Sequence, residues 1–220
     1  AASDVYKRQG LALISPGEGV LSEEGSQRVP QTRAYWVVDP LDGTTNFATG
    51  IPVWAISVAR FVDGRPSEVF LDVPALGQRI VALRGRGVMR NEQALTTATR
   101  QHANSACVSL CSRSIRVLQR KPNQPFPGKI RLFGVASLNL VSVAIGQTIA
   151  ALEATPKIWD LAAAWLVLDE LGCPIRWLDI DPAELSPGQD LSQTSFPMLA
   201  AGSWSELARL LPWGEALIHP

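Results

Sequence analysis

Short runs of apolar residues, many of them β-branched or aromatic, dominate the first half of the chain. Polar, Gly- or Pro-containing segments separate these runs, which cover residues 34–38, 54–61, 67–73 and 79–83. Such runs are typical of β-strands. The turn-forming segment Asp63, Gly64, Arg65, Pro66 lies between the second and third runs. We therefore expect an antiparallel meander of strands in this half.

Helix and strand patterns alternate in the second half. Apolar residues at helical spacing predict helices, and shorter apolar runs predict strands between them. Asp160 is placed as the N-cap of the middle helix. Strands that run together and then alternate with helices favour a layered α/β fold. The expected helices cover residues 137–145, 161–171 and 203–211, and the expected strands cover 130–133, 149–153, 174–178 and 198–201.

Composition narrows the possible functions. The 220 residues fit one large domain or two closely packed halves. Twenty basic residues balance twenty acidic ones, so the chain lacks the positive field typical of nucleic-acid-binding proteins. No apolar run approaches the roughly 20 residues of a membrane-spanning helix, and no signal-peptide pattern opens the chain. We expect a cytoplasmic protein that acts on a small molecule.

Cysteine and histidine are too few for several kinds of site. The three cysteines, Cys107, Cys111 and Cys173, form no C-x-x-C pair and are expected to be buried, reduced thiols. Only two histidines, His102 and His219, are present. A zinc site and a histidine-based nucleophile triad are therefore disfavoured.

An acidic turn follows the first predicted strand. Pro40 and Gly43 favour a sharp reversal that would direct two carboxylates toward one point. Carboxylates, hydroxyls and an amide suit a divalent cation and a phosphate, although Asp, Pro and Gly are also ordinary turn residues. The turn consists of Asp39, Pro40, Leu41, Asp42, Gly43, Thr44, Thr45 and Asn46.

Three further features have both a structural and a functional interpretation. Glu23 and Glu24 could be a solvated pair or could supply a ligand. Asp160 could only cap its helix or could supply another ligand. The segment 85–87, Gly-Arg-Gly, favours a tight turn over a phosphate loop, because no Lys-Ser/Thr pair follows it.

Three motifs in this order resemble the inositol monophosphatase family of magnesium-dependent sugar phosphatases. They are an acidic pair at 21–25, W-x-x-D-P-L-D-G-T-T-N-F at 36–47 and W-D-x-A-A with a later glycine at 159–173. The resemblance covers nearly everything from Gly19 to the C-terminus. It implies a layered α/β/α/β/α sandwich, a homodimer and hydrolysis of a small phosphate ester by metal-activated water.

The resemblance also implies roles for individual residues. Two or three Mg²⁺ ions would be held by Glu23, Asp39, the Leu41 carbonyl, Asp42 and Asp160. Glu23 and Thr44 would be catalytic, with Thr44 orienting the attacking water. The implied substrate-binding residues are Gly43, Thr44, Thr45, Gly134, Ala136 and Glu153, with Ser112 and Arg113 in a further substrate loop.

The resemblance leaves the substrate open. An inositol phosphate or a related polyol phosphate is expected. Fructose-1,6-bisphosphatase, histidinol-phosphatase and 3′-nucleotidase activities are alternatives, as is a catalytically weak metal-binding relative.

The chain departs from the family pattern in three places. Ser22 and Cys173 stand where glycines are usual, and family members carry roughly forty to fifty more residues upstream. Those residues form a helix pair and include an aspartate that helps to activate water, so we expect weak or absent activity from this chain. We interpret residues 1–9 as a non-native leader and residues 10–220 as the domain. Residues 10–130 would form its metal-motif half and 131–220 its C-terminal α/β half.

Overall fold

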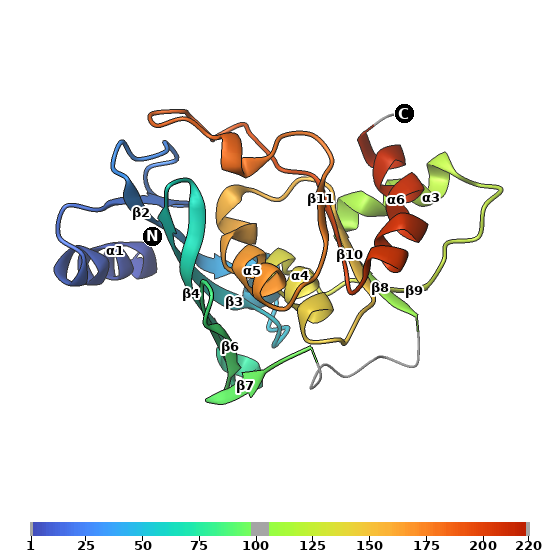
Figure 1. The fold of residues 1–220 in the computed structure, drawn as a ribbon, viewed down its shortest axis with the longest axis horizontal. Helices are drawn as coiled ribbons and strands as arrows, with labels where there is room; N and C mark the ends of the chain where they lie inside the picture. Colours follow the sequence, from blue (N-terminus) through green and yellow to red (C-terminus); the bar gives the residue numbers. More distant parts are fainter. Residues whose placement is uncertain (1, 98–105, 219–220) are drawn as a thin grey trace.

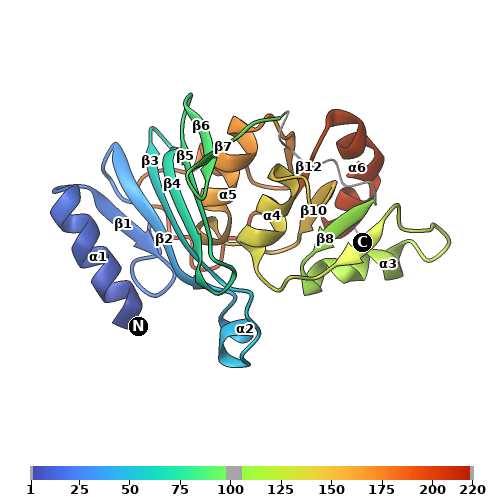
Figure 2. The ribbon, with the colours of Figure 1, turned by 90° about the horizontal axis from the view of Figure 1, so that it is seen from below.

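The computed structural model describes residues 2–97 and 106–218, in five layers of helices and sheets (Figures 1 and 2). Helix α1 lies against one face of the first sheet, and helices α4 and α5 lie between the two sheets. Helices α3 and α6 cover the far side of the second sheet. This is the layered sandwich expected from the sequence. His102 and His219 lie outside the described residues.

The first sheet has seven strands in sequence order, and only the pair β1–β2 is parallel. Asp63 and Gly64 both have positive φ, 53° and 76°, so the hairpin turns on two residues and the next strand begins at Arg65. The expected meander is confirmed. The strands are β1 (Gly19–Ser22), β2 (Ala34–Asp42), β3 (Ala55–Val62), β4 (Arg65–Val73), β5 (Gln78–Leu83), β6 (Gly87–Arg90) and β7 (Gln93–Leu95).

The second sheet has five strands in the order β11-β12-β10-β8-β9. Strand β10 pairs parallel with β8 and antiparallel with β12. Strand β8 was not expected from the sequence, because it has only four residues, all buried, and so short a run gives a weak strand pattern. The strands are β8 (Cys107–Leu110), β9 (Lys129–Arg131), β10 (Ala150–Glu153), β11 (Ile175–Trp177) and β12 (Met198–Ala201).

The two central helices, α4 (Ala136–Ala144) and α5 (Ile158–Glu170), contribute buried residues to the core cluster that they share with the strands of the first sheet. Helix α5 begins three residues earlier than expected. Its N-cap is Lys157, and Asp160 is the third helical residue, whose Oδ2 accepts a hydrogen bond from the Lys157 amide at 2.7 Å. The expectation that Asp160 is the N-cap was therefore wrong, since the carboxylate closes a capping box from inside the first turn.

One of the peripheral helices is longer than expected. Helix α6 (Trp204–Ile218) continues through Pro212, although the expected helix stopped at residue 211. Trp213 and Leu217 are buried beyond the proline, so packing on the second sheet outweighs the lost backbone hydrogen bond. Apart from α1, the other helical segments are α2 (Thr44–Ala48), α3 (Arg116–Arg120) and three 3₁₀ turns at Pro74–Leu76, Ser112–Ile115 and Pro182–Glu184.

The first residues form helix α1 (Ala2–Ile14), which packs beside β2. Asp4 is buried and pairs with Arg8 at 2.8 Å, and the Lys7 Nζ donates to the Pro40 carbonyl at 3.3 Å. Residues 2–9 are thus helical in the structure. That residues 1–9 are a non-native leader stays a prediction.

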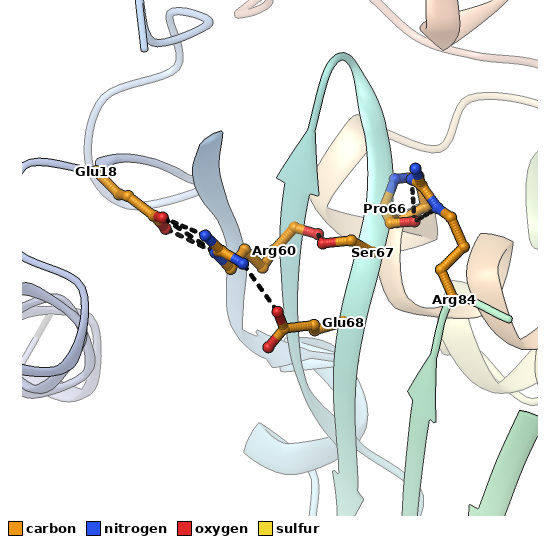
Figure 3. Close-up of polar contacts among 6 residues, drawn as sticks. All are labelled: Glu18, Arg60, Pro66, Ser67, Glu68 and Arg84. Atoms are coloured by element: carbon orange, nitrogen blue, oxygen red, sulfur yellow. Dashed lines mark hydrogen bonds and ion pairs between the residues drawn. The ribbon is translucent and has the colours of Figure 1, made fainter. Parts of the chain in front are cut away.

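A polar cluster joins the segment before β1 to strands β3 and β4 (Figure 3). Arg60 donates to Glu18 at 2.9 Å and to Glu68 at 2.8 Å, and Ser67 donates to the Arg60 carbonyl at 3.1 Å. Arg84 donates to the Pro66 carbonyl close by. Because Glu18 immediately precedes β1, Arg60 fixes the strand that leads to Glu23.

Candidate metal and phosphate site

The end of β2 carries Asp39 and Asp42, and the pairing with β3 shifts register between them. The Leu41 amide donates to Asp39 Oδ1 at 2.9 Å, which bends the chain around that carboxylate. Gly43 follows with φ 88°, and a Cβ there would lie 2.6 Å from Val135 Cγ2. Glycine is therefore required at this position by both backbone conformation and space.

Asp42 connects the first sheet to helix α4. Its two carboxylate oxygens accept hydrogen bonds from the amides of Ala136, at 3.3 Å, and Ser137, at 2.8 Å. These amides belong to the first turn of α4, where a carboxylate is favoured by unpaired N–H groups and by the helix dipole. The first turn of α4 therefore fixes the orientation of Asp42.

Asp160 approaches the same point from helix α5. One oxygen each from Asp39, Asp42 and Asp160 lies within 4.8 Å of the others, and we call these three residues the carboxylate cluster. Asp39 and Asp42 are buried and Asp160 is partly buried. The structure thus brings together three of the four carboxylates that the sequence analysis gave as metal ligands, and their role as ligands stays a prediction.

The cluster holds acidic groups in an environment that disfavours their charge. Burial, followed by the charges of Asp42 and Asp160, raises the pKa of Asp39 to about 10. Burial and the charge of Asp42 raise the pKa of Asp160 to about 7. Burial also raises the pKa of Asp42, although the Ser137 and Ala136 hydrogen bonds oppose it. Such a cluster favours either protons or a cation.

Glu23 lies at the edge of the cluster. It follows β1, its amide donates to the Val38 carbonyl at 3.3 Å, and its side chain is exposed. Partial burial raises the pKa of Glu23, whereas a hydrogen bond with Asp39 lowers it. Glu23 therefore reaches Asp39, but it is not one of the three residues within 4.8 Å of one another.

Thr44 and Leu41 are also adjacent. The Thr44 hydroxyl donates to the Leu41 carbonyl at 3.0 Å, and both Thr44 and Thr45 are exposed at the start of α2. The Gly43 amide lies near enough to the Asp42 carboxylate to lower its pKa. The structure therefore places the hydroxyl, the carbonyl and the main-chain amides of the acidic turn next to the carboxylate cluster.

A cavity of about 350 Å³ opens beside Asp42 and Asp160. Three residues expected to bind substrate, Gly134, Ala136 and Glu153, line it. Its described lining is Asp42, Asn46, Ile51, Cys111, Ser112, Leu132, Phe133, Gly134, Val135, Ala136, Asn139, Glu153 and Asp160. A larger cavity of about 740 Å³ lies elsewhere, beside β4, β5 and β6, and is lined by other residues.

Two asparagines shape this cavity. The Asn46 amide donates to the carbonyls of Val53 and Phe133, both at 2.8 Å, which joins the acidic turn to the loop before α4. The Asn139 amide donates to Glu153 Oε1 at 2.6 Å. Asn46 belongs to the acidic turn identified in the sequence, but no sequence signal marked Asn139.

Glu153 is almost fully buried, with 2% of its surface exposed. Burial, followed by the nearby Cys111, raises the pKa of Glu153 well above its usual value. Cys111 is half-buried at the cavity, whereas Cys107 and Cys173 are buried. The expectation of three buried thiols was therefore wrong for Cys111, because the cavity opens beside it.

Comparison with known proteins agrees with this geometry. The model of the inositol monophosphatase family matches residues 1–210. The chain belongs to the inositol monophosphatase family. Family members are phosphatases that hydrolyse phosphate monoesters. Among curated relatives, histidinol-phosphatase of Mycobacterium tuberculosis is 36% identical over 188 residues, with 80% of this chain and 71% of that protein covered.

Other relatives carry different names. The Nus factor SuhB of Xylella fastidiosa is 35% identical over 184 residues, with 78% of this chain and 66% of that protein covered. This chain thus spans about two thirds of the length of these two relatives. A solved inositol monophosphatase/NADP phosphatase in complex with Mg²⁺ and phosphate superposes with a TM-score of 0.76 at 24% identity, covering 95% of this chain and 77% of that chain. The fold is therefore that of the family.

Within residues 2–97 and 106–218, no helix is both long and apolar enough to cross a bilayer.

Proposed function

We propose that this chain hydrolyses a small phosphate monoester at the carboxylate cluster, with Mg²⁺ as its cofactor. The observation that carries the proposal is the approach of Asp39, Asp42 and Asp160 to within 4.8 Å of one another beside a cavity. Three separate elements, β2, α4 and α5, position these carboxylates. Burial and mutual repulsion raise the pKa values of all three carboxyl groups, so the cluster would bind either protons or a cation that balances its charge.

The donor set fits magnesium. Mg²⁺ prefers oxygen ligands and keeps some positions for water and substrate phosphate. The proposed ligands for two or three ions are Glu23, Asp39, the Leu41 carbonyl, Asp42 and Asp160. When bound, the metal lowers the pKa of a water molecule and neutralises charge on the phosphate. The relative solved with Mg²⁺ and phosphate supports the choice of metal.

The chain's own groups would orient the reactants. The Thr44 hydroxyl, which donates to the Leu41 carbonyl, would orient the attacking water, and Glu23 would assist from the edge of the cluster. The main chain of Gly43, Thr44 and Thr45 would contact the phosphate. The alcohol portion would occupy the cavity beside Gly134, Ala136 and Glu153. Fixed dipoles suit a transition state whose charge spreads over three oxygens.

The substrate belongs to the phosphate esters on which the named relatives act. An inositol or related polyol phosphate is the family expectation, and the curated relative from M. tuberculosis supports histidinol phosphate. The solved relative supports a nucleotide phosphate as a further candidate. Family resemblance also supports a homodimer in the cytoplasm as part of the proposal.

A phosphate-release screen with and without Mg²⁺ tests the function. Inositol phosphate, histidinol phosphate, fructose bisphosphate and adenosine 3′,5′-bisphosphate cover the candidate substrates. Asp42→Asn should lower kcat/KM by about 100-fold or more and abolish the Mg²⁺-dependent rise in Tm, because it removes a buried ligand charge. The exposed Asp179→Asn serves as the control for loss of one carboxylate. Unaltered activity in Asp42→Asn would refute the mechanism.

A further inference from the structure

A further cavity, of about 170 Å³, opens where helix α4 and strand β5 meet the 3₁₀ turn at Pro74–Leu76, and we call it the second cavity. Phe133 lines both the second cavity and the cavity beside the carboxylate cluster. The described lining of the second cavity contains none of the proposed metal ligands and none of the residues expected to bind substrate. The two cavities are therefore adjacent but separate.

Apolar side chains form most of the wall of the second cavity, and several of them are fixed in the core. Ile80, Val141 and Ile145 line it, are 1%, 2% and 8% exposed, and belong to the main core cluster. Leu138 lines it as well and packs against the same core cluster. An apolar space of about 150 Å³ is large enough to hold benzene. The second cavity therefore has room for one aromatic ring with a small substituent.

The charge of the lining indicates a neutral ligand. Among the described residues that line the second cavity none is charged, and its polar members are Gln78, Ser142 and Gln147. The Ser142 hydroxyl already donates to the Asn139 carbonyl at 2.6 Å. Each glutamine amide offers two donors and one acceptor oxygen. A charged ligand would lose hydration without gaining an opposite charge, whereas a neutral ring with one polar group can pair with an amide.

Two residues of the second cavity are hydrogen-bonded to the acidic turn. The carbonyls of Val53 and Phe133 line up with one donor group, the side-chain amide of Asn46, which donates to each at 2.8 Å. Asn46 follows Thr45 in the acidic turn and also lines the cavity beside the carboxylate cluster. A ligand that packs against Val53 and Phe133 would therefore hold both acceptors of Asn46 in place.

We propose that the second cavity is an effector site for a small neutral aromatic molecule, and that its occupation strengthens phosphate binding at the acidic turn. The ring contacts Leu138 and Val141, and one hydroxyl or N–H group pairs with the amide of Gln78 or Gln147. Because the ligand and the phosphate favour the same arrangement of the Asn46 acceptors, each binds more tightly when the other is present. The ligand site goes beyond the proposed function, and its coupling to phosphate rests on that function.

Indole tests the site, because it is neutral, aromatic and has a single N–H group. Calorimetric titration of the full chain should give a Kd of about 1 mM or lower. Leu138→Trp introduces a ring into the second cavity and should weaken indole binding by about tenfold or more. The matched control is Leu13→Trp on α1, where the leucine is 83% exposed, and it should leave the affinity unchanged.

Absence of indole binding to the wild type, or equal affinities of the wild type and Leu138→Trp, would overturn the site. Should Leu138→Trp fail to fold, Gln147→Trp places the ring in the same cavity from an exposed position and replaces it in the comparison.

Inorganic phosphate tests the coupling, in calorimetric titrations with Ca²⁺ in place of Mg²⁺. Saturating indole should tighten phosphate binding by about fivefold, and phosphate should tighten indole binding by the same factor, because coupling between two sites is reciprocal. Leu138→Trp should bind phosphate with an affinity that indole does not change. A wild-type phosphate affinity that indole leaves unchanged or weakens would overturn the coupling.

Phosphate release separates this inference from the proposed function. Mg²⁺-dependent release from a phosphate monoester without any binding of indole would retain the function and overturn the inference. Indole binding that Leu138→Trp abolishes, in a chain that neither binds nor releases phosphate, would retain the site and overturn the function together with the coupling.

Discussion

At the scale of single residues, Asn46 links two segments that are distant in sequence. Its buried amide group donates to the carbonyls of Val53 and Phe133. Asn46→Ala leaves both carbonyls without this donor, so we expect a loss of about 2 kcal/mol in the free energy of unfolding. Urea denaturation measures the loss. The exposed Asn123→Ala should change stability by less than about 0.5 kcal/mol. Equal stability of Asn46→Ala and wild type would contradict this role.

The raised pKa of Asp39 predicts an unusual pH dependence. An acid whose pKa is raised to about 10 on folding favours its protonated form in the folded state. Its contribution to stability is therefore greatest below its unfolded pKa, about 3.8, and is lost as pH rises toward 10. Without divalent ions, Tm should fall between about pH 5 and pH 9, and Mg²⁺ should raise Tm more at the higher pH.

Asp39→Asn provides the comparison for this pH dependence. It removes a carboxyl group that must take up a proton, or bury a charge, when the chain folds at pH 9. The metal-free Tm of Asp39→Asn should therefore exceed that of the wild type at pH 9 and respond little to Mg²⁺. Scanning calorimetry across pH measures both effects. A metal-free wild-type Tm that rises from pH 5 to pH 9 would show that repulsion within the carboxylate cluster does not destabilise the fold.

Residue-level chemistry was predictable where the signal was local. The Asp39–Asn46 stretch indicated a metal and phosphate turn, since its carboxylates, glycine and hydroxyls lie within eight residues. The anchoring of Asp42 was not predictable, because its donors at Ala136 and Ser137 lie more than ninety positions away. Asn139 was missed because an asparagine within an apolar helix has no distinctive pattern.

At the scale of elements, the ion pair between Glu18 and Arg60 holds the segment that leads into β1. The hydrogen bond from Arg60 lowers the pKa of Glu18. An acid with a lowered folded pKa stabilises the fold above its unfolded pKa of about 4.5, and this contribution is lost as pH falls through the folded pKa.

Glu18→Gln should therefore reduce the free energy of unfolding by about 1 kcal/mol at pH 7. The difference from the wild type should shrink below about pH 4, where the wild-type Glu18 becomes protonated. Denaturation curves at several pH values measure this difference in the free energy of unfolding, and the exposed Glu184→Gln is the control. A difference that is independent of pH would show that Glu18 acts through packing instead.

Elements with a strong local pattern were predicted, and their ends were not. The Asp63–Gly64 turn and helix α4 agree with the sequence to within a residue or two. Helix α6 extends past Pro212 because Trp213 and Leu217 pack on the second sheet, and that contact is not visible in local sequence. Strand β8 has only four residues, and its pairing with β9 and β10 defines it.

At the scale of the whole molecule, Trp165 in α5 joins the two sheets. Its ring packs edge-on against Phe61 of β3, at 6.0 Å between centroids, and against Trp177 of β11, at 5.3 Å. Trp165→Ala should cost about 3–5 kcal/mol, since it leaves a large void between the layers. Thermal unfolding measures the loss, and Trp204→Ala, where the residue is 73% exposed, is the control. Similar losses in both variants would contradict this role.

The anchoring of Asp42 on α4 also has a consequence for how the protein would acquire a metal ion. Asp39 and Asp42 lie in the first sheet, which the amino-terminal half of the sequence forms. Asp160 and the amides that orient Asp42 belong to residues after 135. A partly folded chain, in which these regions have not docked, would lack a high-affinity site. Divalent ions would then bind only the native state and shift the folding equilibrium toward it by mass action. Ion uptake would accordingly be a late event in maturation, and ion depletion would loosen the junction between the two sheets first.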